Sequence, residues 1–208
     1  MKTTPILLAG FMALLLATGC YPHRKANLNY SASILRDGYL LVRLQNSEKK
    51  VAALLKAGLF EKAHSAAEEQ EEKNRSIMKA FDDAFEASPV YFFYASHTNE
   101  VLHGQLGDAL IFDSQKCPVD TRQLAGKPFL VAEAGRGYAD WMAARDEKGQ
   151  VTGVAGTNSF DALILRGPDM APYYQLTTLG GYETAVEKLS AKLEKYLQGP
   201  VELYSLGN

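Results

Sequence analysis

The chain has 208 residues, of which 47% are hydrophobic, and its 22 basic and 24 acidic side chains give a net charge of −2. This length and composition suit one domain with a buried core rather than a disordered chain. The near-neutral balance, without a basic stripe interleaved with aromatic residues, excludes nucleic acid as an expected partner.

The first twenty residues form a short apolar segment that ends in a cysteine. Lys2 gives it a positive start, and the run of about 15 residues from Pro5 to Gly19 is shorter than the ~20 residues that span a bilayer. Small residues precede Cys20. The pattern resembles the lipobox of bacterial lipoproteins, although Ala17 stands where Leu is more usual.

The lipobox resemblance implies that residues 1–19 are a cleaved signal peptide and that Cys20 carries the lipid. Two or more acyl chains hold a protein stably at a membrane surface. Tyr21 replaces the Asp that favours inner-membrane retention, so the resemblance favours the outer membrane of a bacterial cell envelope. The alternative is an ordinary cysteine after an ordinary secretory signal.

Residues 20–33 are polar and are interpreted as a lipid-anchored tether, and residues 34–208 as one α/β domain. The basic segment 23–25 is either solvated or in contact with lipid phosphates. The pattern predicts a strand over 38–44, a helix over 48–57 that ends at Gly58, and a long helix near 59–87.

Two features stand out in the long predicted helix. Residues 68–75 are a charge run, which is typical of a solvated face. Ile77, Phe81 and Phe85 recur every four residues, which predicts a stripe that faces the core.

Further strands are predicted where short apolar runs occur. Their continuous apolar character indicates burial on both faces, as in a sheet covered by helices. A helix over 182–197 closes the fold. We therefore expect a single-domain α/β sandwich with a mixed sheet of about four to six strands. The predicted runs are 89–94, 109–112, 128–132, 151–155 and 161–165, and the short link between the first two allows an antiparallel pair.

The long charged helix that leads into Pro89–Tyr94 is similar to a segment found in a group of exported bacterial proteins, many of them lipoproteins. The buried strand followed by a turn at Pro172–Tyr174 is similar as well. The resemblance covers most of residues 38–197 and includes no catalytic motif, so it implies export but no activity.

Polar side chains follow several of the predicted strands. They are His97, Asp113, Glu133, Arg136 and Arg166. If these strands are parallel neighbours, their carboxyl ends would form one cleft that could run acid/base chemistry or bind an anionic ligand. The alternative is that loops begin at strand ends and are polar by default.

No metal or cofactor is expected. His97, Glu100 and His103 are not spaced to share one helix face, and the glycine-bearing turns lack the phosphate-binding patterns. With Cys20 assigned to lipid, Cys117 has no intramolecular partner and is interpreted as a turn residue rather than a functional thiol.

These observations predict a membrane-anchored envelope lipoprotein that acts as a non-catalytic binding or accessory module, with a possible envelope protein as partner. The alternative is a small envelope enzyme or anionic-ligand binder that uses the strand-end cleft of His97, Asp113, Glu133 and Arg136. An enzyme gathers titratable groups in a pocket, whereas an accessory protein exposes an apolar patch, for which the predicted helix pair is a candidate.

Overall fold

Three parallel strands form the centre of a six-stranded sheet. The structure, a computed structural model, describes residues 21–138, 142–145, 151–155 and 159–198. The strand order is β3-β2-β1-β4-β7-β8, in which β2, β1 and β4 are parallel and β3, β7 and β8 run antiparallel to their neighbours. The strands are β1 (Tyr39–Leu44), β2 (Val90–Tyr94), β3 (Ile111–Phe112), β4 (Phe129–Tyr138), β7 (Ser159–Arg166) and β8 (Pro172–Thr177), and β5 (Met142–Arg145) and β6 (Val151–Ala155) form a separate hairpin.

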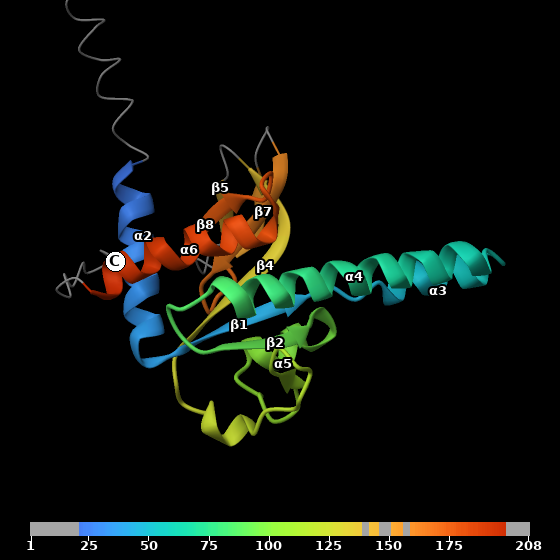
Figure 1. Ribbon diagram of the computed structural model, residues 1–208, viewed down its shortest axis with the longest axis horizontal. Helices are drawn as coiled ribbons and strands as arrows, with labels where there is room; N and C mark the ends of the chain where they lie inside the picture. Colours follow the sequence, from blue (N-terminus) through green and yellow to red (C-terminus); the bar gives the residue numbers. More distant parts are fainter. Residues whose placement is uncertain (1–20, 139–141, 146–150, 156–158, 199–208) are drawn as a thin grey trace, which may run out of the picture.

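Helices cover one face of the sheet, and short elements cover part of the other (Figure 1). Alternate residues of β1 show why: Leu40, Val42 and Leu44 pack in a core with α2, α4 and α6, whereas Tyr39 and Leu41 pack on the opposite face. Both sets are buried, so β1 is apolar except at Arg43. The helices are α2 (Tyr21–Asp37), α3 (Glu48–Lys56), α4 (Phe60–Ala84), α5 (Thr98–Leu102) and α6 (Gly181–Leu197), with 3-10 turns η1 (Ala95–His97) and η2 (Thr121–Gln123).

The α3 and α4 helices form a hairpin that extends beyond the sheet (Figure 1). Gly58 has φ +73°, and its N–H donates to the Leu55 carbonyl while the Leu59 N–H donates to the Leu54 carbonyl. This pair of bonds is the Schellman motif, in which glycine takes the left-handed conformation at little cost. The turn therefore ends α3 and sends the chain back along α4.

The expected fold class is confirmed: an α/β fold with a mixed six-stranded sheet. The long helix spans Phe60–Ala84, and its predicted stripe of Ile77, Phe81 and Phe85 is buried. The β2–β3 pair is antiparallel. Local periodicity was sufficient here because each of these segments buries a strongly apolar face.

The N-terminal segment differs from the expected tether over 20–33. From Tyr21 to Asp37 it is helical, and Leu28, Ala32 and Leu35 are buried beside the sheet and α6. Small polar residues obscure this stripe in the sequence; Ser31, for example, is fully buried, and its hydroxyl donates to the Asn27 carbonyl at 2.7 Å. The packed domain therefore begins before residue 34.

Other element boundaries also differ. The strand expected over 128–132 continues to Tyr138, because β7 pairs with it through Ser159. The strand expected over 109–112 is reduced to two residues, and the segment at Pro172–Tyr174, interpreted as a turn, begins β8. These limits are set by pairing between strands that are distant in the sequence. A local sequence pattern carries no information about such pairing.

A buried tyrosine gives the domain a measurable pH dependence. The Tyr39 hydroxyl is buried with no hydrogen-bond partner among the described residues, and burial, assisted by nearby Tyr91, raises the pKa of Tyr39 to about 12. The pKa of Tyr39 in the folded protein lies above the ordinary value near 10, so the folded protein holds the phenol proton more tightly than the unfolded chain does. The contribution of this proton to the free energy of unfolding is fully present below about pH 10. It is lost, by roughly 2–3 kcal/mol, as the pH rises towards 12.

Tyr39→Phe should therefore stabilise the protein at pH 7 by about 1 kcal/mol, since it removes an unpaired buried hydroxyl. It should also flatten the fall in the free energy of unfolding between about pH 10 and 12, measured by urea denaturation. Tyr30→Phe, at an exposed position, is the control. An unchanged alkaline profile for Tyr39→Phe would contradict this account.

Candidate functional site

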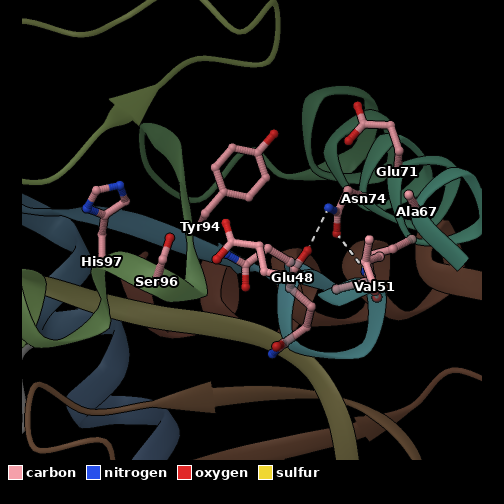
Figure 2. A pocket seen from close by; sticks show the side chains of 12 residues that line it. Glu48, Val51, Ala67, Glu71, Asn74, Tyr94, Ser96 and His97 are labelled. Carbon is pink, nitrogen blue, oxygen red and sulfur yellow. Dashed lines mark hydrogen bonds between the residues drawn. The ribbon is translucent and has the colours of Figure 1, made fainter. Parts of the chain in front are cut away.

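A pocket of about 480 Å³ lies where the parallel strands β1 and β2 end. Three chain segments form it: the loop from Gln45 to the start of α3, one face of α4, and the end of β2 with η1 (Figure 2). Ligands in open α/β sheets bind at this end of the strands. The lining residues are Gln45, Asn46, Ser47, Glu48, Val51, Ala67, Gln70, Glu71, Asn74, Tyr94, Ser96 and His97.

Hydrogen bonds hold one wall of this pocket in place. Asn74 is only 3% exposed, and its side-chain amide donates to the Gln45 carbonyl at 2.8 Å. Its Oδ1 accepts from Gln70 Nε2 at 3.1 Å, and Gln70 Oε1 accepts from the Ser47 hydroxyl at 3.4 Å. Spacing along α4 puts Ala67, Gln70 and Asn74 on one face. The chain of bonds ties α4 to the loop that follows β1.

A lysine from a distant loop pairs with one of the carboxylates that line the pocket. The Lys116 ammonium pairs with the Glu71 carboxylate, and this hydrogen bond raises the pKa of Lys116. Lys116 itself has φ 63°. One of the two carboxylates that line the pocket is therefore neutralised by a partner.

A second polar cluster, Arg43–Glu133–Arg166, lies on the sheet face opposite the helices. Glu133 is buried, and its carboxylate accepts from Arg43 Nη1 at 2.5 Å and from Arg166 Nε at 2.7 Å. Arg166 also donates to the Met170 carbonyl at 2.8 Å. Arg43 and Glu133 are register partners on the parallel strands β1 and β4, which places the two side chains together.

The five residues expected to share a cleft are divided among several places. Glu133 and Arg166 meet in the cluster with Arg43, and His97 lines the pocket. The Asp113 carboxylate accepts from the backbone N–H groups of Gln115 and Cys117, at 2.9 Å each, and caps that turn.

Arg136 forms an exposed cross-strand pair with Asp161. The division has two structural causes. Asp113 is set apart because β3 runs antiparallel to β2. Arg136 is set apart because β4 continues to Tyr138, and side chains alternate along a strand, so Arg136 lies on the face of β4 opposite to Glu133.

Sequence reasoning missed most residues of the pocket and one member of the charged cluster. Arg43 had a usable signal, because it interrupts an otherwise apolar strand. Gln70 and Asn74 had none, since both belong to the charge run over 68–75, which resembles a solvated face. Their role depends on α4 crossing the end of β1.

The hairpin end is a third feature of interest. Leu55, Leu59 and Phe60 gather around the turn and are 45%, 42% and 68% exposed. The α3 helix has no buried residue, and only small residues, Ala63 and Ala66, are buried in the first half of α4. The hairpin end thus presents large apolar side chains to solvent.

Within the described ranges, no helix has the length and apolarity needed to cross a membrane. The same residues contain no cluster of three or more histidine, cysteine or acidic side chains placed to hold a metal ion. Cys117 is exposed, and Cys20 with the expected signal peptide over 1–19 lies outside the described residues. Comparisons with protein-family models, curated proteins and solved structures found no match.

Proposed function

We propose that this protein is a lipid-anchored envelope protein that acts as a non-catalytic accessory module and binds a partner protein through the end of its α3–α4 hairpin. The observation that carries the proposal is the exposure of Leu55, Leu59 and Phe60 around one turn. Clustered apolar side chains that the domain does not bury are typical of interaction sites. Lipid attachment at Cys20 supplies the location and rests on the lipobox pattern.

The chemistry around the hairpin end favours a particular partner surface. Residues 48–62 carry four lysines and two glutamates, a net charge of +2. The complementary surface is an apolar patch edged by acidic side chains, since matched charge at the rim guides association and specificity. The hairpin end and α2, which follows Cys20 directly, lie at opposite ends of the long axis of the molecule (Figure 1). Because of this separation, we expect the hairpin end to bind a partner protein rather than the membrane that holds the lipid anchor.

Site-specific photo-crosslinking in intact cells tests the proposal. A photo-reactive residue in place of Phe60 should give a discrete protein adduct, and the same residue in place of Leu179, which is 92% exposed and lies outside the hairpin, should not. Lys56→Glu combined with Lys62→Glu should lower the adduct yield. Phe60→Glu should weaken binding of the purified partner about 30-fold, the roughly 2 kcal/mol that an aromatic anchor contributes.

Two controls separate the parts of the proposal. Leu179→Glu should leave partner binding unchanged. Cys20→Ala should release the protein from the membrane fraction, and a processed, membrane-bound Cys20→Ala variant would refute lipid attachment. Identical adducts from positions 60 and 179, or full binding by Phe60→Glu, would refute the hairpin as the docking surface.

A further inference from the structure

The pocket at the ends of β1 and β2 has the size of a small-molecule site. Its volume of about 480 Å³ lies within the range of about 300–1,000 Å³ found for ligand pockets. It is bounded by both helices at the base of the hairpin and by the end of a central strand, and Asn74 in its wall is buried.

The lining excludes several classes of ligand. Only Val51 and Ala67 are aliphatic, which argues against a fatty or steroid-like molecule. No lysine or arginine lines the pocket, whereas two carboxylates do, so a phosphate or carboxylate ligand would be repelled. Because Lys116 already neutralises Glu71, the pocket also lacks the concentrated negative charge that a polycation would need.

The remaining side chains are of the kind that both donate and accept hydrogen bonds. Four carboxamides and two hydroxyls line the pocket, together with the His97 imidazole and the Tyr94 phenol. Within the described part of the chain, the side chains of Asn46, Ser96 and His97 make no hydrogen bond and are available to a ligand. The bonded wall of Ser47, Gln70 and Asn74 is already ordered, which lowers the entropy cost of binding.

We propose that this pocket binds a neutral saccharide. Sugar hydroxyl and acetamido groups donate and accept in the same way as the carboxamides and hydroxyls that line it, and they carry no charge for Glu48 to repel. The Tyr94 side chain borders the pocket beside Ser96 and His97 (Figure 2), and its ring offers an apolar surface to the C–H face of a sugar ring. An extended peptide fits less well, because Phe92 and Phe93 of β2 are already paired with β1 on one side and with β3 on the other.

The test is saturation-transfer NMR and calorimetric titration of the purified full-length protein in detergent. The neutral probes are N,N′-diacetylchitobiose, maltotriose and trehalose; the comparison probes are galacturonate and trialanine. At least one neutral saccharide should bind, and more tightly than galacturonate or trialanine. Ser96→Ala combined with His97→Ala should weaken that binding at least about tenfold, the loss expected for two hydrogen bonds.

A matched double variant, His103→Ala with Ser114→Ala, removes the same residue types outside the pocket and should bind the saccharide normally. Asn46→Ala is a second pocket variant, and thermal denaturation checks that each variant is folded. Failure of all three saccharides to bind, tighter binding of galacturonate or trialanine, or equal binding by folded pocket variants would each overturn the proposal. The outcome is independent of hairpin docking, because none of these substitutions alters residues 55–60.

Discussion

Glu133→Ala is expected to cost about 3–5 kcal/mol of the free energy of unfolding, because it leaves two guanidinium groups facing each other without their shared carboxylate. The side chains of Arg43, Glu133 and Arg166 are 23%, 8% and 16% exposed, so solvent screens them little. Removing one member of a buried ion cluster leaves an uncompensated charge, and that penalty exceeds the net contribution of the pair itself. Urea denaturation followed by circular dichroism measures the loss.

Two further variants separate charge from packing. Glu133→Gln retains the shape and one acceptor and should cost less than Glu133→Ala. Replacing all three residues together, with Arg43→Met, Glu133→Leu and Arg166→Met, should come within about 1–2 kcal/mol of the wild type, because no charge remains buried. A Glu133→Ala protein with less than about 1 kcal/mol of destabilisation would show that water reaches the cluster freely.

Gly38→Ala is expected to destabilise the fold by about 3 kcal/mol or more, since the added methyl group has no room. A Cβ at this position would lie 2.1 Å from the Pro128 carbonyl oxygen and 2.6 Å from the Ile34 carbonyl oxygen. Both are backbone atoms, and the Pro128 oxygen also accepts a hydrogen bond from the Tyr39 N–H at 3.2 Å. To make room for the methyl group, either the end of α2 or the segment that leads into β4 at Pro128 must move. Overpacking of this kind typically costs 1–3 kcal/mol of the free energy of unfolding, occasionally more.

The matched control is Gly107→Ala, where an added Cβ would have nothing within 4 Å. That variant should lie within about 0.5 kcal/mol of the wild type, as is usual for a surface change without lost contacts. Thermal denaturation of both variants makes the comparison. Equal melting temperatures for the two would contradict the close approach of the chain at Gly38.

Local patterns in the sequence were sufficient for the class of fold and most of its helices and strands. The stripe of Ile77, Phe81 and Phe85 specified which face of α4 is buried, and Gly58 specified where α3 ends. Such features depend on residues a few positions apart, so periodicity and turn chemistry are enough to predict them.

The tertiary structure alone decided which polar residues meet. Strand direction separated Asp113 from the rest of the expected cleft, the continuation of β4 beyond Glu133 separated Arg136, and strand register joined Arg43 to Glu133. The crossing of α4 over the end of β1 placed Asn74 against the Gln45 carbonyl. These contacts join residues 29 to 90 positions apart. Non-local pairing of this kind is set by the packing of whole elements, which no short stretch of sequence encodes.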